Sequence, residues 1–278
     1  LEICGSDLAR GAVYDELTKA GIEVAVGEQD GEFLESKLRE GIDWFVYTSA
    51  LPEDQTELVM AKEAGIKPIL GCEVYVAPNS RFDKELTGGD DRYYHLVLLA
   101  ENNEGYQNLM KIVSKGFVDG YYYKPRVDKE VLRTYHEGII CTSACLAGEV
   151  QRYLNRGFYE EGKKAALKYE SIFGKGNFFL ELQDHGIEEQ KRLNPLLVKL
   201  AKETDTPLVA TNDVHYLTRE DAHNQDVLIC IQTGKTLDDE NRMRFANDQF
   251  YLKSEEEMRK IFASMPEVID NTQIVADA

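Results

Sequence analysis

Short apolar runs alternate with amphipathic helical stretches along most of this 278-residue chain, and this rhythm constrains the fold more than any other feature. Such repetition predicts βα units and a largely parallel sheet. The expected strands cover residues 2–4, 22–26, 44–47, 68–76, 94–100, 138–142, 177–182 and 207–210. The expected helices cover residues 12–20, 32–39, 55–64, 104–115, 158–173, 188–203 and 219–232. About eight strands with intervening helices favour a closed α/β barrel over an open sheet.

The rhythm stops near residue 233. Residues 235–254 predict an irregular loop with a short strand, and residues 255–278 predict two short helices. A tail of this kind is typical of a connection to a further domain.

Charge and cysteine content limit the classes of partner. The net charge of −18 argues against broad electrostatic binding to nucleic acid, so any such contact would be local or made by another part of a larger protein. The odd number of scattered cysteines predicts a reducing, cytoplasmic location. We expect no membrane partner, because no apolar run approaches the length of a bilayer span and no signal-peptide pattern is present.

The expected strand 207–210 runs into a polar tip that carries Asp213 and His215. Residues two apart in an extended chain point to the same side. A carboxylate and an imidazole at a strand end suit one half of a metal site. The alternative is a capped loop, in which Asp213 bonds the backbone and His215 is a surface histidine.

The other expected strands carry further metal-capable side chains. A parallel α/β barrel gathers functional groups at the carboxyl ends of its strands. Glu73, His95 and Cys145 lie on or just after such strands, with Glu181 and His185 near the end of another. Carboxylate, imidazole and thiolate together suit zinc or manganese bound to phosphate. His95 fits least well, because it lies at the start of its strand.

Each of these residues has a purely structural alternative. Glu73 could be a buried acid paired with a lysine, His95 a core histidine, and Cys145 a small buried hydrophobic residue. Glu181 and His185 could only brace their loop. The metal hypothesis therefore depends on the set rather than on any single member.

One loop places aromatic residues beside cations: Tyr121, Tyr122, Tyr123, Lys124 and Arg126. This composition can stack bases and contact phosphates, which makes Tyr122, Lys124 and Arg126 candidate nucleic-acid contacts. The alternative is an interdomain packing loop, which the acidic character of the chain favours.

From about residue 66 onward, the chain resembles the PHP (polymerase and histidinol phosphatase) domain of bacterial DNA polymerase III alpha subunits. The resemblance lies in residues 71–78, 94–100, 120–126, 180–186, 210–216 and 230–235. It implies a distorted TIM-like barrel, a metal cluster at the barrel mouth and a role in DNA replication. It also implies other polymerase domains and a proofreading exonuclease subunit as partners. Carried over by position, the implied metal ligands are Glu73, His95, Cys145, Asp213 and His215.

Residues 1–66 depart from that family. A PHP domain opens with a His-x-His strand and a second strand ending in Asp-His, but residues 1–66 contain no histidine. The segment instead resembles the first domain of a Mur ligase (UDP-N-acetylmuramate–amino acid ligase). The matching positions are Gly5-Ser-Asp7, residues 21–24, residues 46–50, Pro52 and residues 57–61. The glycine-rich nucleotide loop of that family would precede Leu1.

The chain is therefore interpreted as a join between two families, with the crossover at residues 61–67. We expect Mur-ligase-like βα units over residues 1–66 that complete the barrel, the remaining PHP barrel over residues 67–232, and a connection toward a polymerase domain over residues 233–278.

The leading functional hypothesis is the N-terminal part of a DNA polymerase III alpha-type nucleotidyltransferase. Its palm carboxylates would lie beyond Ala278, so this chain alone should not polymerise DNA. The alternatives are a metal-dependent phosphoesterase of the 3′–5′ exonuclease type, a non-catalytic scaffold, and UDP-nucleotide binding by the Mur-like segment. An active site would use Asp213 and His215. Because both N-terminal histidine motifs are missing, we expect an incomplete, catalytically impaired zinc or manganese site.

Overall fold

The computed structural model describes residues 4–7, 23–26, 35, 59–60, 67, 69–85 and 92–278. The chain divides into two compact units, residues 1–70 and 71–278. In the first unit, β1 (Cys4–Asp7) and β2 (Glu23–Val26) pair in parallel, as expected for a βα unit. The expected strand 44–47 and nearly all of the expected helices 12–20, 32–39 and 55–64 lie outside the described residues.

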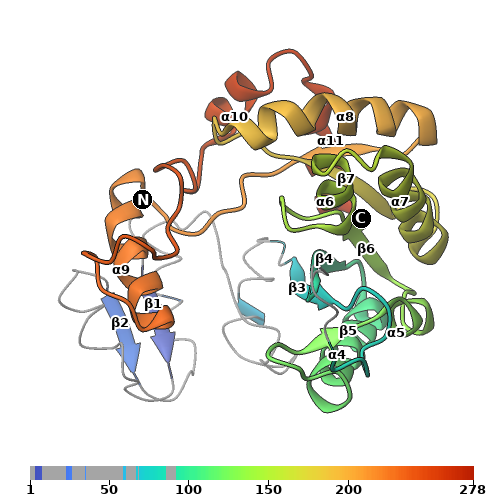
Figure 1. Cartoon of the computed structure of the whole chain (residues 1–278), viewed down its shortest axis with the longest axis horizontal. Coiled ribbons are helices and arrows are strands. Elements are labelled where there is room, and N and C mark those ends of the chain that lie inside the picture. Colours follow the sequence, from blue (N-terminus) through green and yellow to red (C-terminus); the bar gives the residue numbers. More distant parts are fainter. Residues whose placement is uncertain are drawn as a thin grey trace. The chain divides into compact units, whose positions relative to one another are not determined.

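A six-stranded sheet with helices packed against it forms the second part of the fold, which confirms the mixed α/β class (Figure 1). The strand order is β5-β3-β4-β6-β7-β8. The strands are β3 (Leu70–Val76), β4 (Tyr94–Ala100), β5 (Arg126–Val127), β6 (Ile139–Thr142), β7 (Phe178–Leu182) and β8 (Leu208–Ala210).

Strand direction within this sheet corrects one expectation. The pairs β3–β5, β6–β7 and β7–β8 are parallel, but β4 pairs with β6 in the antiparallel direction. Contacts between β3 and β4 also run in opposite order, joining Gly71 to Leu99, Glu73 to His95 and Tyr75 to Tyr93. The strand β4 is thus reversed against both of its neighbours, in a sheet expected to be largely parallel.

The helices of this part cover the sheet and follow it. They are α4 (Asn103–Val118), α5 (Lys129–Thr134), α6 (Glu149–Asn155), α7 (Tyr159–Phe173), α8 (Glu188–Thr204), η1 (Arg219–Asp221), α9 (Ala222–Thr233), α10 (Glu255–Ile261) and α11 (Glu267–Asp277). Helix α4 packs on β4 and β5, α7 and α8 on β7, and α11 on β8. The two short C-terminal helices agree with the prediction. The short strand expected within residues 235–254 is absent from this described segment, where an isolated bridge joins Tyr216 to Tyr251.

The burial of the central strands explains why they could be predicted from the sequence. All five residues of β7 are buried, as expected for a strand covered on both faces. In β4, Tyr94, Leu96 and Leu98 alternate with partly exposed residues, so one face of this strand packs against α4. The core therefore fixes which β4 side chains are left at the surface, His95 among them.

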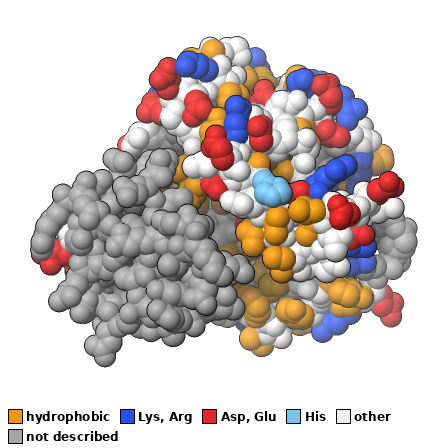
Figure 2. Space-filling view, turned by 90° about the vertical axis from the view of Figure 1, so that its left-hand side faces the viewer, with side chains coloured by type: hydrophobic (Ala, Val, Ile, Leu, Met, Phe, Trp, Pro, Cys, Tyr) orange, Lys and Arg blue, Asp and Glu red, His pale blue; other side chains and the backbone are white. Residues whose placement is uncertain are grey.

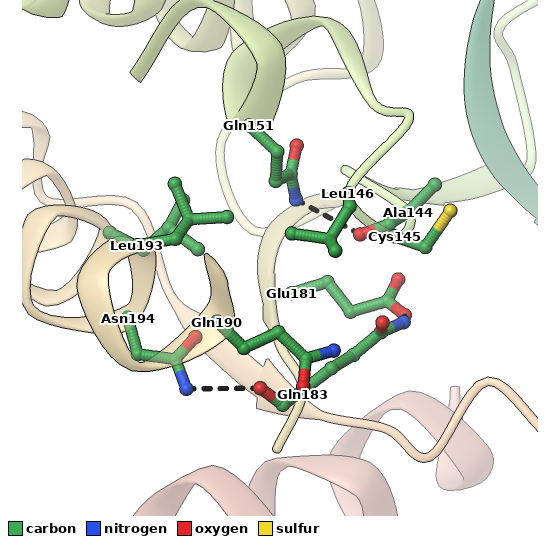
Figure 3. Close-up of a pocket in the computed structure, with 10 residues that line it drawn as sticks. Ala144, Cys145, Leu146, Gln151, Glu181, Gln183, Gln190, Leu193 and Asn194 are labelled. Carbon is green, nitrogen blue, oxygen red and sulfur yellow. Dashed lines mark hydrogen bonds between the residues drawn. The ribbon is translucent and has the colours of Figure 1, made fainter. Parts of the chain in front are cut away.

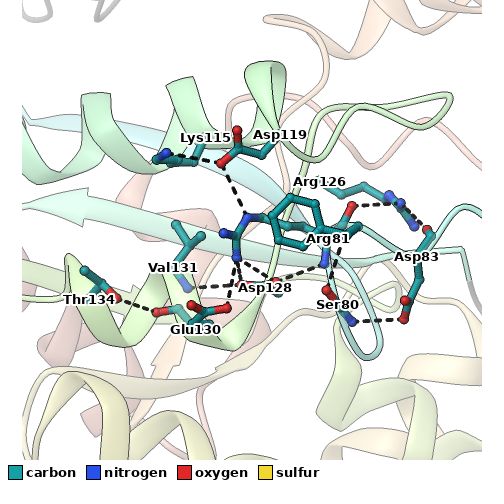
Figure 4. A network of polar contacts seen from close by, with 11 residues as sticks. Ser80, Arg81, Asp83, Lys115, Asp119, Arg126, Asp128, Glu130, Val131 and Thr134 are labelled. Atoms are coloured by element: carbon teal, nitrogen blue, oxygen red, sulfur yellow. Dashed lines mark hydrogen bonds and ion pairs between the residues drawn. The ribbon is translucent and has the colours of Figure 1, made fainter.

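A charged network fastens the loop that follows β3 to the start of α5 (Figure 4). Nη1 of Arg81 lies 3.0 Å from Asp128 and 3.2 Å from Glu130. Arg126 is 1% exposed and donates to the backbone oxygens of Asp83, at 2.6 Å, and Arg81, at 3.3 Å. Because Arg126 is held by backbone carbonyls, its guanidinium serves the fold at the β3–β5 end of the sheet.

The surface in Figure 2 shows hydrophobic side chains gathered beside a histidine, with acidic and basic side chains interspersed over much of the remaining coloured surface. None of the described helices is long and apolar enough to cross a membrane.

Candidate metal site

Three of the five predicted ligands come together at one edge of the sheet. Glu73 lies on β3, His95 on β4, and Cys145 three residues after β6. One ligand atom of each lies within 4.8 Å of the other two. Nδ1 of His95 is 3.1 Å from Oε1 of Glu73 and 3.5 Å from Sγ of Cys145. This spacing is close enough for the three side chains to share one ion.

The reversal of β4 explains how His95 reaches this edge. Its position at a strand start was the weakest part of the sequence hypothesis. Because β4 is antiparallel to β6, however, the start of β4 lies beside the end of β6. The backbone N–H of His95 donates to the carbonyl of Ala147, at 3.1 Å, just beyond Cys145.

A tight turn after β6 positions Cys145. The backbone of Ala144 is left-handed, with φ of 61°, which is rare for a residue with a side chain. Nε2 of Gln151 supports the turn by donating to Oγ of Ser143, at 2.6 Å, and to the carbonyl of Ala144, at 2.9 Å. In Figure 3, the sulfur of Cys145 and the carboxylate of Glu181 lie toward the same end of a small pocket. The turn therefore directs the thiol toward the acidic end of that pocket.

The electrostatics of the site favour a cation. Burial raises the pKa of the Cys145 thiol to about 12, and the carboxylates of Asp213, Glu73 and Glu181 add to this rise. A divalent ion would offset those negative charges and stabilise the thiolate. Carboxylate, imidazole and thiol are also ordinary zinc ligands, so the residues present fit a metal ion.

Asp213 and His215 form a separate pair on the loop after β8. Nε2 of His215 lies 3.4 Å from Oδ1 of Asp213, and the His215 ring contacts Phe245, with centroids 4.6 Å apart. Among the described residues, this pair does not join the cluster of mutually close ligand atoms. The charge of Asp213 nevertheless reaches the cluster, since it contributes to the raised pKa of Cys145.

Glu181 braces the region between the two groups. Its side chain is 5% exposed and accepts hydrogen bonds from Thr142, Thr211 and Gln183. Burial raises the pKa of this carboxyl, whereas the three hydrogen bonds oppose the rise. These contacts tie together the ends of β6, β7 and β8, which is the bracing role considered from the sequence.

His185 fixes the loop that carries Asp213. Its Nε2 lies 2.7 Å from the backbone oxygen of Asn212, and its Nδ1 lies 2.8 Å from Nε2 of Gln190. These partners require a neutral ring with the proton on Nε2. Burial lowers the pKa of His185, which agrees with a neutral ring. With both nitrogens engaged, His185 positions the loop and leaves no nitrogen for a metal ion.

Residues that were not predicted from the sequence bind the C-terminal tail to this loop. Nδ2 of Asn212 donates to the carbonyl of Tyr251, at 2.6 Å, and Nζ of Lys253 donates to Oδ1 of Asn212, at 3.1 Å. The backbone N–H of His215 donates to the carbonyl of Phe250, at 2.8 Å. No sequence pattern links residue 212 to residues 250–253, because the contact exists only once the tail has folded back.

The three predicted nucleic-acid contacts differ in burial and in the residues that they contact. Arg126 is buried within the fold and is not offered to an outside ligand. Tyr122 is half-buried, with the Arg126 guanidinium 5.1 Å from its ring centroid. Lys124 lies over the Tyr75 ring, with Nζ 5.6 Å from the centroid. Of the three predicted contacts, Arg126 lies on β5, paired with Tyr75 of β3, and Lys124 is the one whose cation lies over the Tyr75 ring.

Two known protein families match overlapping stretches of the chain. Residues 55–185 match the family described as "PHP domain", and residues 1–71 match the family described as "Mur ligase family, catalytic domain". The two matches share residues 55–71, which include the crossover predicted at residues 61–67.

Curated relatives match most of the chain. DNA polymerase III subunit alpha of Treponema pallidum is 50% identical over 212 residues, which cover 76% of this chain and 18% of the relative. The same subunit of Borreliella burgdorferi is 46% identical over 217 residues, covering 78% and 19%, respectively. That of Deinococcus radiodurans is 44% identical over 218 residues, covering 76% and 16%. The chain spans less than a fifth of the length of these relatives. Residues 55–185 are therefore similar to PHP domains, most of the chain is similar to part of DNA polymerase III alpha subunits, and residues 1–71 are similar to Mur ligases.

Proposed function

We propose that this chain is the N-terminal PHP part of a DNA polymerase III alpha-type protein that acts in DNA replication. The names and identities of the relatives support this role. Nucleotidyl transfer itself would belong to other parts of such a protein. We further propose that the six-stranded sheet is part of a distorted TIM-like barrel, in which Mur-ligase-like units over residues 1–66 replace the first βα units.

Within that protein, Glu73, His95 and Cys145 hold one divalent ion. The observation that carries this proposal is the approach of three ligand atoms to within 4.8 Å of one another. The thiolate of Cys145 makes zinc a better fit than manganese, because soft sulfur ligands select zinc. A zinc ion held by these three residues would supply a Lewis acid and would link β3, β4 and the turn after β6 through its ligands.

The site is incomplete for a metal cluster. Residues 1–66 supply no histidine, and Asp213 and His215 stand apart from the three ligands. We therefore infer that the ion chiefly stabilises a scaffold for the neighbouring polymerase domains and a proofreading exonuclease subunit. The free cysteines and the polymerase relatives support a cytoplasmic location for this assembly.

A second candidate function is phosphoester hydrolysis. The specific observation in its favour is the pairing of Asp213 with His215, whose Nε2 lies 3.4 Å from Oδ1 of the carboxylate, and this carboxylate helps to raise the pKa of Cys145. In that case, Asp213 and His215 would hold a second ion or move a proton. Turnover of a simple phosphodiester that requires added metal and is lost in Asp213→Asn would support this function. Turnover that persists in the variant would assign the activity to a contaminant.

Cobalt substitution tests the proposed ligand set. Cobalt(II) bound by a thiolate shows a sulfur-to-metal charge-transfer band, so the wild-type chain should show the band and Cys145→Ser should lack it. Cys72→Ser is the matched control, because Cys72 is half-buried on β3 beside Glu73 but lies outside the cluster. A band that survives in Cys145→Ser would contradict the proposal.

A further inference from the structure

Two tyrosines lie against the candidate metal site. The rings of Tyr75 and Tyr93 are 4.6 Å apart between centroids. The His95 ring lies 5.3 Å from Tyr75 and is stacked on Tyr93 at 6.0 Å, with an interplanar angle of 5°. Tyr75 is two residues after Glu73, and Tyr93 is two residues before His95, so the alternation of side chains in extended backbone places each tyrosine on the same side as its neighbouring ligand.

Two cations extend this aromatic surface away from the metal ligands. Nζ of Lys124 lies 5.6 Å from the Tyr75 centroid, and the guanidinium of Arg92 lies 5.0 Å from the Tyr123 centroid. No carboxylate among the described residues forms an ion pair with either cation. Within the described part of the chain, their charge is therefore left unneutralised, in a protein whose net charge is −18.

Tyr123 is held at the surface in an energetically unfavourable backbone conformation. Its φ of 61° lies in the left-handed region, which is unusual for a bulky residue, and its side chain is 64% exposed. The turn is closed by a hydrogen bond from the N–H of Tyr122 to the carbonyl of Lys124, at 3.0 Å. Strain of this kind is concentrated at functional sites. A glycine would relieve it, but would not present an aromatic ring.

We propose that Tyr75, Tyr93, Tyr123, Arg92 and Lys124 form a binding strip for single-stranded nucleic acid that ends at His95. Unpaired bases would stack on the tyrosine rings, and the cations would contact the phosphates between them. Paired bases expose no face for such stacking, so the strip fits a single strand rather than a duplex. This inference goes beyond the proposed metal function, and binding to the strip requires no bound ion.

The first test measures the affinity of the chain for a fluorescent oligothymidylate of about 12 nucleotides, by anisotropy at low salt with a chelator present. Tyr123→Gly should weaken binding by about 5- to 100-fold, because one base–aromatic stack is lost. The same variant should melt at a higher temperature than the wild type, because glycine accepts the left-handed backbone. Loss of affinity therefore could not be attributed to misfolding. Phe158→Ala, which removes an exposed aromatic at the start of α7, is the control and should bind like the wild type.

The second test measures the salt dependence of the same affinity. Arg92→Gln combined with Lys124→Gln should reduce the slope of log affinity against log salt by about 1.4, the value for two phosphate contacts on a single strand. Lys164→Gln combined with Lys168→Gln, two exposed lysines of α7, removes the same charge elsewhere and should leave the slope unchanged.

Three results would overturn the strip: no measurable binding at low salt, equal affinities for the wild type and Tyr123→Gly, or tighter binding to duplex DNA or an acidic peptide. The bound metal is counted in parallel on the same samples prepared without chelator. If the chain bound metal but no oligonucleotide, the strip would be refuted and the proposed function would stand. If it bound the oligonucleotide but no metal, only the metal site would be refuted.

Discussion

Glu73, His95 and Cys145 form one cluster, and Asp213 and His215 form a separate pair; all five were predicted as metal ligands, but their surroundings differ. The cluster draws Glu73 from the middle of β3, His95 from the start of β4 and Cys145 from the turn after β6, and its ligand atoms converge. The pair comes from a single loop, and its histidine packs on Phe245. Convergence of separate strands, rather than spacing within one loop, is what distinguishes a ligand set from two neighbouring polar residues.

The two regions also differ in what holds them in place. The cluster depends on the sheet itself, through the direction of β4 and the turn before Cys145. The Asp213 loop depends on long-range contacts with His185 and with the tail at Lys253.

The largest expected effect is stabilisation by zinc. At a free zinc concentration of about 100 times Kd, binding should add about 3 kcal/mol to the free energy of unfolding, which is roughly 5–10 °C in melting temperature. His95→Ala should abolish this shift. His136→Ala, at a half-buried histidine whose ring nitrogen Nδ1 lies 2.9 Å from the carbonyl of Arg133, should retain it. Differential scanning fluorimetry of the metal-stripped chain provides the measurement, and an equal shift in both variants would refute the cluster.

Asn212→Ala should weaken the attachment of the tail while sparing the cluster. The substitution removes the hydrogen bonds to Gln249, Tyr251 and Lys253, and leaves the buried ammonium of Lys253 with fewer partners. We expect a loss of about 2–3 kcal/mol in chemical denaturation. Asn224→Ala, at an exposed amide of α9, should cost less than about 0.5 kcal/mol. If Asn212→Ala also eliminated the zinc shift, the two regions would form one site.

His185→Gln should produce a smaller, pH-dependent change. Burial lowers the pKa of His185 in the folded chain, so the unfolded state binds more protons once the pH falls below about 6.5. The wild type should therefore lose stability relative to the glutamine variant as the pH falls from 8 toward 5. Glutamine can supply both an N–H donor and an acceptor without titrating. Urea denaturation across this range provides the test, and a constant difference between the proteins would show that His185 does not titrate in this way.

The smallest effect is expected for His215→Asn. The ring contacts with Phe245 and Phe250 would be lost at a side chain that is 38% exposed, at a cost of about 0.5–1 kcal/mol. The zinc shift should remain. Its loss would extend the metal site to the loop after β8.

The sequence predicted features that depend on a single strand or helix, but it did not predict features that depend on how two elements pair. Residues 94–100 were predicted with the bounds that β4 has, because alternation within one strand is a local pattern. The two-residue strand β5 was missed, since it is too short to show a period. The direction of β4 depends on pairing with β6, which no local pattern encodes. This missing information made His95 look like a poor ligand.

The same distinction applies to the residues around the site. Tyr75 and Tyr93 were within reach of sequence reasoning, because each is two positions from a predicted ligand. Asn212 and Lys253 were not, because 40 residues of intervening chain separate the positions that their hydrogen bond joins. Arg126 was chosen from the cationic composition of its loop, whereas its burial is a property of the assembled network with Asp83 and Arg81.

The most direct test of this account is the number of zinc ions bound per chain, measured by native mass spectrometry on three proteins. The wild type should bind one ion, Cys145→Ser none, and the combined variant Asp213→Asn with His215→Asn again one. Two or three ions on the wild type, or loss of the ion in the combined variant, would contradict a single site formed by Glu73, His95 and Cys145.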